Sequence, residues 1–207
     1  MLYTPTHFAV DDRATMAALL RANPFATLIT HGTEEPMVSH VPLLLVEGAD
    51  PWRLLGHLAR ANPQWQTWGG RRRVTVIFHG GDAYISPRLY SARKAVPTWN
   101  YAVVHAHGVV EPAHDSETKE QVLKALIDRH DDAYRSQWDE LDLTYREGMK
   151  AGIVAFTIAV EHLEAKYKVS QNRPEEDRAR VLQAMESGND KERMLAVWTL
   201  RLAKRGQ

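Results

Sequence analysis

Residues 53–85 have the sequence RLLGHLARANPQWQTWGGRRRVTVIFHGGDAYI, and this stretch decides the fold. Runs of apolar and β-branched residues predict strands over 53–59 and 73–78, and 83–85 predicts a further short strand after Gly80-Gly81. Between the first two runs, Asn62-Pro63 starts a short helix that Gly69-Gly70 ends. A doubly wound parallel sheet would need a helix of useful length after nearly every strand, and connections as short as this one indicate an antiparallel sheet instead.

The rest of the chain repeats this pattern of strands with short connections. Strands are expected at 25–30, 37–46, 98–110 and 153–160. Pro42 indicates an edge or a bulge in the second of these, because proline cannot donate to a ladder. Helices are expected after Asp11-Asp12, from Ser116, after Pro174 and over 191–204. The prediction is an α+β fold, mainly β: a closed or partly closed antiparallel barrel with flanking helices and a C-terminal helical pair.

Composition restricts the class of protein further. The 207 residues suit one domain, or one domain with a modest appendage. Lys plus Arg number 26 and Asp plus Glu also 26, which disfavours a surface that binds nucleic acid all over but leaves a local basic patch open. The absence of cysteine excludes disulfides, iron–sulfur clusters and thiol nucleophiles. The sequence shows no signal peptide and no apolar run of membrane length, so the expected location is cytoplasmic.

The common catalytic motifs are missing. The sequence contains no GxGxxG after a strand, no P-loop, no GxSxG and no HExxH. His105 and His107 lie two residues apart on a predicted strand and therefore share a face, which is workable geometry for a metal. No third ligand follows at a recognisable spacing, so no metal site is predicted. No catalytic residue stands out either.

The first candidate binding segment is residues 56–65, where the strand over 53–59 opens into a loop and a helix. The strand delivers His57 and Arg60 to the loop, and Asn62 stands at the start of the helix. Polar side chains gathered in this way can hold a phosphate or a polyol. The alternative is a solvated loop followed by a helix cap.

The second candidate segment, KYKVSQNRP, covers residues 166–174. Lys168 and Arg173 are cations that can bind an anion, and Gln171 and Asn172 add neutral hydrogen-bonding groups. The next helix begins with the acidic residues 175–177, which would repel an anion placed at the helix end. Side chains would therefore have to hold any anion here. The alternative is a basic loop before an acid-capped helix.

The third candidate segment is aromatic and spans residues 82–101. It carries Tyr84, Tyr90, Trp99 and Tyr101 together with hydroxyl and amide groups. Aromatic faces of this kind can wall a planar ligand. Tyr and Trp are also enriched at dimer interfaces. Composition leaves both interpretations open.

Taken together, these segments resemble the family of FMN-binding negative transcriptional regulators of the PaiB type. The likeness runs from Met1 through about Met185 and includes the long motifs VPTWNYAVVHAHG (96–108) and KVSQNRPE (168–175). It implies a split β-barrel, FMN as cofactor, a regulatory function and a homodimer with flavin sites between subunits. We therefore expect an FMN-binding domain over 1–173 and a helical extension over 174–207 that packs on the barrel or on the partner subunit.

FMN needs cations for its phosphate, neutral polar groups for its ribityl chain and a flat apolar slot for its ring. The resemblance leads us to assign the phosphate to Arg60 and Lys168, with Arg173 in reserve. The ribityl chain or ring edge is assigned to four polar residues: His57, Asn62, Gln171 and Asn172. The walls of the slot are assigned to Trp99 and Tyr101.

Two other functions stay open beside the regulator. One is a flavin-dependent oxidoreductase of the pyridoxamine-phosphate-oxidase-like type, because a flavin carries its own redox chemistry. The other is a non-catalytic flavin or tetrapyrrole carrier, for which His105 or His107 would be the first iron ligands to test. The sequence shows no DNA-reading motif, so direct DNA contact would need the basic residues of the tail: Lys191, Arg193, Arg201, Lys204 and Arg205.

Overall fold

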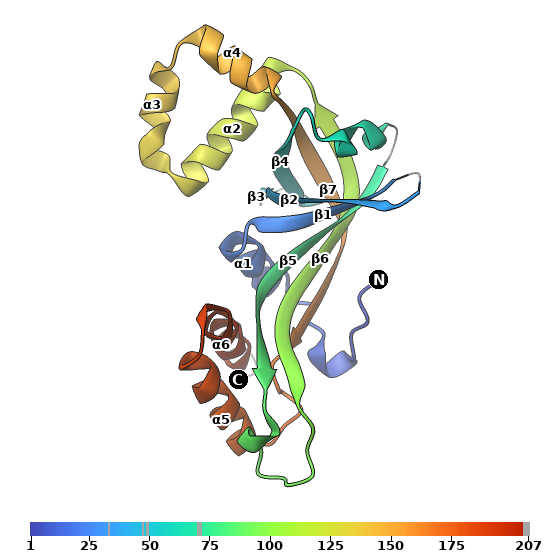
Figure 1. The fold of residues 1–207 in the computed structure, drawn as a ribbon, viewed down its shortest axis with the longest axis vertical. Helices are drawn as coiled ribbons and strands as arrows, with labels where there is room; N and C mark the ends of the chain where they lie inside the picture. Colours follow the sequence, from blue (N-terminus) through green and yellow to red (C-terminus); the bar gives the residue numbers. More distant parts are fainter. Residues whose placement is uncertain (33, 47, 49, 70–71, 205–207) are drawn as a thin grey trace. The chain divides into compact units, whose positions relative to one another are not determined.

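Seven antiparallel strands form one sheet in the order β2-β1-β5-β6-β7-β4-β3 (Figure 1). The structure, a computed structural model, describes residues 1–32, 34–46, 48, 50–69 and 72–204. The strands are β1 (Phe25–His31), β2 (Pro36–Pro42), β3 (Leu44–Val46), β4 (Arg53–Ala59), β5 (Arg72–Ile85), β6 (Thr98–Ala113) and β7 (Ile153–Lys168). The predicted fold class, mainly β with flanking helices, is confirmed.

The chain divides into two compact units, which we describe separately. The first unit contains residues 1–23, 78–105 and 164–207, and the second contains residues 24–77 and 106–163. The long strands β5, β6 and β7 contribute residues to both. This division differs from the expected one at 173/174, which stays a prediction.

The second unit holds most of the strand pairing. Strand β1 pairs with β2 and β5, and β4 pairs with β3 and β7, all antiparallel. Alternation places Leu54 and Leu58 of β4 in the core, where Phe156 of β7 is also fully buried. The short helix η2 (Pro63–Trp68) adds the indole of Trp68, which meets the ring of Phe156 edge-on at 5.0 Å.

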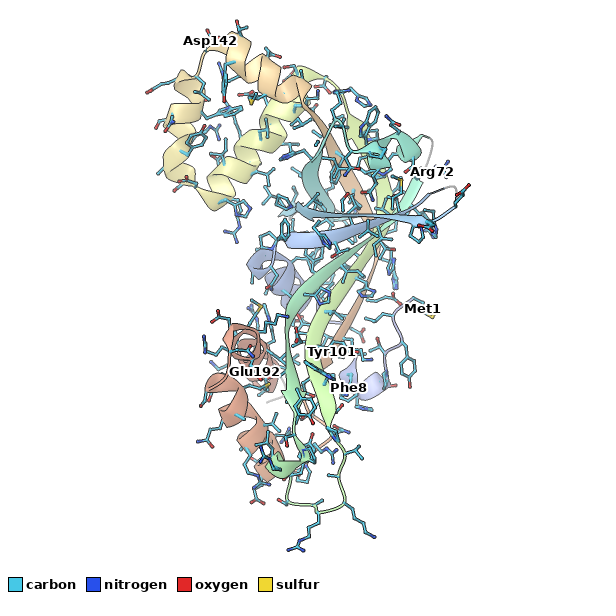
Figure 2. The ribbon with its side chains drawn as sticks, viewed as in Figure 1. Met1, Phe8, Arg72, Tyr101, Asp142 and Glu192 are labelled. Atoms are coloured by element: carbon cyan, nitrogen blue, oxygen red, sulfur yellow. The ribbon has the colours of Figure 1, made fainter. Side chains whose placement is uncertain are left out.

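Three α-helices of this unit lie between β6 and β7 in the chain: α2 (Ser116–His130), α3 (Arg135–Glu140) and α4 (Leu143–Ala151), with the short helix η4 (Asp132–Tyr134) between the first two. Asp115 caps α2 and Asp142 caps α4, each through its side chain. Figure 2 labels Asp142 at the start of α4. The Glu120 carboxylate joins the helices, because it accepts from Trp138 at 2.8 Å and pairs with Lys150 at 3.1 Å. Only the first of these helices was expected from the sequence.

The first unit carries the helices near both ends of the chain, η1 (Thr6–Phe8), α1 (Arg13–Ala22), α5 (Glu175–Glu186) and α6 (Asp190–Ala203), and the short helix η3 (Pro87–Leu89) between β5 and β6. Asp12 caps α1 as expected, accepting from the backbone of Thr15 at 2.8 Å. Figure 1 shows α5 and α6 side by side, and the buried Leu195 and Trp198 belong to the inner face of α6. None of the helices in the described residues is both long and apolar enough to span a membrane.

Three strand boundaries differ from the prediction. The strand expected over 37–46 breaks at Leu43, whose N–H donates to Pro24 instead of a sheet neighbour, and β2 ends at Pro42 as an edge strand. Strand β5 continues through Gly80-Gly81, where two strands were expected, and Gly81 takes a φ of +97° within it. Strand β7 continues to Lys168, so the basic segment starts inside a strand.

Candidate functional site

The residues assigned to a cofactor fall in both units. His57, Arg60 and Asn62 belong to the second unit. Trp99, Tyr101, Lys168, Gln171, Asn172 and Arg173 belong to the first. Their assignments to a flavin stay predictions, and each group is described by itself below.

His57 lies near the end of β4, opposite Ala155 of β7. It shares a strand face with Leu55, while the neighbouring Gly56 faces Leu43 and Phe156 so closely that a Cβ there would lie 2.5 Å from a Leu43 methyl carbon. The His57 Nδ1 atom is buried and has no hydrogen-bond partner in the described part of the chain. Burial also lowers the pKa of His57, so its ring is held neutral.

The burial of His57 predicts a specific pH dependence of stability. The imidazole has a folded-state pKa below its unfolded value of about 6.5, so its stabilising contribution is complete above that pH and is lost as the pH falls. Replacing His57 by Asn should therefore flatten the decline of melting temperature between roughly pH 7 and pH 5. The other nine of the ten histidines remain in both proteins, so parallel pH curves would contradict the prediction.

Arg60 stabilises the end of a helix. Its Nε donates to the carbonyl of Ala151 at 2.8 Å and one terminal nitrogen donates to that of Ile153 at 3.3 Å. These carbonyls lie at and just past the C-terminus of α4, where a cation is favoured by the helix dipole. The buried Lys119 does the same for the carbonyl of Lys150 at 3.0 Å. The other terminal nitrogen of Arg60 contacts no acceptor among the described residues and is available to a ligand.

Asn62 caps η2, as the sequence indicated. Its Oδ1 accepts from the N–H of Gln64 at 2.9 Å, and its Nδ2 donates to the Ser39 hydroxyl at 2.8 Å. Gln64 follows as a nearly fully buried amide whose Nε2 donates to Thr30 and to the carbonyl of Met37, each at 3.1 Å. The loop after β4 is therefore fixed by the side-chain hydrogen bonds of Asn62 and Gln64, just after Arg60, and is preorganised.

A small cavity of about 230 Å³ also lies in the second unit, and the sequence analysis missed it. Thr30, His31, Thr67, Arg72 and Arg73 line it. Arg73 is already paired with Glu161 at 2.5 Å, and the Arg72 Nε donates to the Gly69 carbonyl at 3.2 Å. The run of arginines after Gly69-Gly70 was the available signal. The lining can accommodate an anion.

In the first unit, the end of β7 and the loop after it form a polar cluster. Lys168 donates to the Thr98 hydroxyl, and Gln171 folds back to donate to the carbonyl of Tyr167 and to accept from the N–H of Val169 at 2.8 Å. Both the Oε1 and the Nε2 atom of the Gln171 amide thus hold the loop. Asn172 is exposed in the following turn.

Ser170 connects this loop to β6. It takes a left-handed conformation with φ 66°, and its hydroxyl accepts from Asn100 at 2.8 Å. Asn100 is fully buried, and its Oδ1 has no partner in the described part of the chain. A strained serine and an unpartnered amide oxygen are features that sequence reasoning did not identify.

Aromatic rings in this unit contact cations or each other. The guanidinium of Arg173 lies 4.2 Å from the ring centre of Tyr90. Lys166 places its ammonium 5.4 Å from the ring centre of Tyr101. Trp99 is 55% exposed and meets the exposed Tyr84 edge-on at 5.9 Å. Because this pair is exposed, both interpretations of the aromatic segment stay open: stacking on a planar ligand and contact with a partner subunit.

A family model described as "Putative FMN-binding domain" matches residues 2–162. A Bacillus subtilis (strain 168) protein named "Protease synthase and sporulation protein PAI 2" is 35% identical over 189 residues, which cover 90% of each chain. The matched family region contains His57, Arg60 and Asn62 and ends before Lys168.

Two solved structures are similar in fold. The FAD and heme binding protein from Mycobacterium smegmatis has a TM-score of 0.61 at 19% identity, covering 83% of this chain and 78% of its own. The flavocytochrome Anf3 from Azotobacter vinelandii has a TM-score of 0.62 at 20% identity, covering 83% and 75%. At these identities the likeness establishes the fold.

Proposed function

The chain belongs to the FMN-binding domain family whose model matches it, and from that premise we propose that it is an FMN-containing regulatory protein of the PaiB-like kind. FMN is the cofactor that this membership implies. The observation that carries the proposal is the family match over residues 2–162, which includes all of the second unit except its last residue, Leu163. The regulatory role is supported by the PaiB resemblance and by the 35% identical relative, whose name refers to sporulation.

The chemistry of the second unit fits part of FMN. Arg60 offers a terminal nitrogen without an acceptor among the described residues, on a loop that Asn62 and Gln64 hold in place. His57 offers a buried Nδ1 that lacks a partner in the same part of the chain. Bound FMN would supply redox chemistry of its own. The residues of this chain would bind its phosphate and polar edge and orient it.

The absorbance spectrum of the purified protein tests the cofactor. We expect flavin bands, and release by heat or acid should yield FMN identified by mass. A colourless protein that also takes up no added FMN would contradict the proposal. Steady NAD(P)H turnover by the flavin-loaded protein would instead favour the oxidoreductase and count against a purely regulatory role.

We propose Arg60 as the principal cation for the FMN phosphate, because Lys168 lies beyond the matched region and already donates to Thr98. Replacing Arg60 by Ala should weaken FMN binding by about 1.5–3 kcal/mol, the range for a charge-assisted hydrogen bond. Fluorescence titration with FMN measures this. Melting temperatures are recorded in parallel, since the substitution also removes two hydrogen bonds at the end of α4.

Two further variants test whether other cations bind the FMN phosphate instead of Arg60. Arg72→Ala changes the small cavity and Lys168→Ala changes the β7 segment, while both leave the α4 end intact. The proposal expects the largest loss of FMN affinity in Arg60→Ala. If Arg72→Ala or Lys168→Ala weakens FMN and Arg60→Ala does not, the phosphate lies elsewhere and the assignment of Arg60 is wrong.

We further propose a two-fold homodimer in the cytoplasm. Exposed apolar side chains support this assembly, with Trp99, Tyr84 and Val96 in the first unit and Phe25 and Val38 in the second. An interface of roughly 2,000 Å² or more, in the obligate range, is expected. Sedimentation at micromolar concentration should show twice the chain mass, and a species of 23.5 kDa alone would contradict the proposal.

Direct DNA contact is the part of the regulatory proposal that needs its own test. The tail cations are largely engaged within the chain: Arg193 pairs with Asp190, Lys191 lies 3.5 Å from Asp82, and Arg201 stacks near Trp198. Arg205 lies outside the described residues. A mobility shift that weakens steeply with salt would support operator binding. Salt-insensitive or absent binding would point to regulation without direct DNA contact.

A further inference from the structure

The first unit contains a cavity of about 610 Å³, well inside the range of small-molecule sites. The loop after β7, both C-terminal helices and Ala9-Val10 form its walls. Apolar side chains, among them Val169, Leu182 and Leu200, make up most of the lining. Apart from Ala9-Val10, every lining residue lies beyond residue 162, outside the matched family region.

The neutral polar groups of the cavity wall are already used within the protein. The Oε1 and Nε2 atoms of the Gln171 amide each bond to the backbone of the loop. The Thr199 hydroxyl donates to the carbonyl of Leu195 at 3.0 Å. The groups left to recognise a ligand are therefore the charged side chains of α5.

Two of those charges line the cavity without an ion-pair partner among the residues that the structure describes. On α5, the Arg180 guanidinium forms an ion pair with the Glu176 carboxylate, with an N···O distance of 2.6 Å, and also pairs with Asp177. Glu175 and Arg178 lie three residues apart, a spacing that permits an ion pair, yet no ion pair or side-chain hydrogen bond of either occurs among the described residues. The cavity thus presents one carboxylate and one guanidinium beside an apolar wall.

We propose that this cavity binds a small zwitterion with apolar substituents, such as an apolar amino acid or a short apolar peptide. The ligand carboxylate bonds to Arg178, its ammonium bonds to Glu175, and its side chains cover Leu182 and Leu200. A fatty carboxylate would satisfy Arg178 but be repelled by Glu175, and an alkylamine would meet the opposite conflict with Arg178. This site is additional to the FMN site and does not depend on it.

Calorimetric titration of the full-length protein with L-leucyl-L-leucine tests the proposal. We expect saturable binding that weakens at least about tenfold when the dipeptide is N-acetylated or C-amidated, because each cap removes one charge-assisted contact. Arg178→Gln and Glu175→Gln should weaken binding to a similar extent. Ala179→Phe, which fills the cavity without changing a charge, should abolish it.

Matched controls separate this site from general charge effects and from the flavin. Glu186→Gln on the same helix and Arg88→Gln on η3 are exposed charge changes away from the cavity and should leave dipeptide binding unchanged. FMN affinity should be unchanged in Arg178→Gln, so a failure here is distinguishable from a failure of the FMN proposal. Absence of binding at millimolar dipeptide, equal binding of the capped forms, or equal binding of octanoate would overturn the proposal.

Discussion

Replacing Gly108 by Ala is expected to destabilise the protein by about 4 kcal/mol or more, or to prevent folding. Gly108 lies on β6, and a Cβ at this position would stand 2.1 Å from the carbonyl oxygen of Ala159 and 2.9 Å from its carbonyl carbon. Both are backbone atoms of β7, so they cannot move aside as a flexible side chain would. Relief of the clash would require the two strands to separate. Urea unfolding followed by circular dichroism measures the loss.

A second glycine serves as the matched control. Gly148 lies on the exposed side of α4, where a Cβ meets no heavy atom within 4 Å. Its replacement by Ala should stabilise the protein slightly, by roughly 0.5–1 kcal/mol, because glycine is a poor helix former. If Gly108→Ala unfolds at the same urea concentration as the parent, the close approach of β6 and β7 is wrong.

Elements whose signals are local were predictable from the sequence. Strand β4 has the bounds expected for it, since its alternation and its Asn62-Pro63 exit lie within a dozen residues. The capping of α1 by Asp12 is equally local. In both cases a few neighbouring residues determine the backbone, so a reading along the chain is sufficient.

Gly80-Gly81 shows where local reading fails. A glycine pair after a strand normally indicates its end. In the structure, β5 continues through the pair because α6 packs on it: a Cβ at Gly81 would lie 2.5 Å from the carbonyl oxygen of Lys191, more than a hundred residues later. The glycines therefore allow α6 to pack closely on β5, and no residue near them in the sequence indicates this contact.

Helices α3 and α4 were not expected because the segment over 131–152 carries many charged residues and few apolar ones. Their stability depends on α2, through the Glu120 carboxylate and its partners Trp138 and Lys150. Burial alone raises the pKa of Glu120, but hydrogen bonds from Trp138 and Lys150 outweigh it, and the net pKa lies below the ordinary value. Such interactions exist only once the helices have come together.

The candidate site was predictable in its segments but not in its details. Asn62 as a cap follows from sequence, whereas the contacts of Arg60 with the end of α4 connect residues some ninety positions apart. The buried amide of Asn100 and the left-handed Ser170 likewise depend on a pairing between β6 and the loop after β7. The types of side chain in the sequence indicated the candidate segments, but tertiary contacts decide which of their polar groups remain without a hydrogen-bond partner.

Replacing Trp198 by Ala is expected to cost about 3–5 kcal/mol, the range for removing a large aromatic side chain from a core. Trp198 is only 3% exposed, and its ring meets that of Tyr167 edge-on at 6.2 Å. The indole also lies directly over Gly80, where a Cβ would come within 2.8 Å of its Nε1. Its removal leaves a cavity that the strand cannot close. Thermal melting of the variant measures the loss.

Three comparisons show whether that loss reflects docking of α6 on its own unit. Val197→Ala changes the neighbouring residue, which is 58% exposed, and should cost well under 1 kcal/mol. Trp198→Phe keeps most of the ring and should cost much less than Trp198→Ala, in part because the indole N–H has no partner in the described part of the chain. Deleting residues 190–207 should lower the melting temperature at least as much as Trp198→Ala while changing any DNA affinity little. A truncated protein that keeps its stability and loses salt-sensitive DNA binding would show instead that this helix is a nucleic-acid-binding arm.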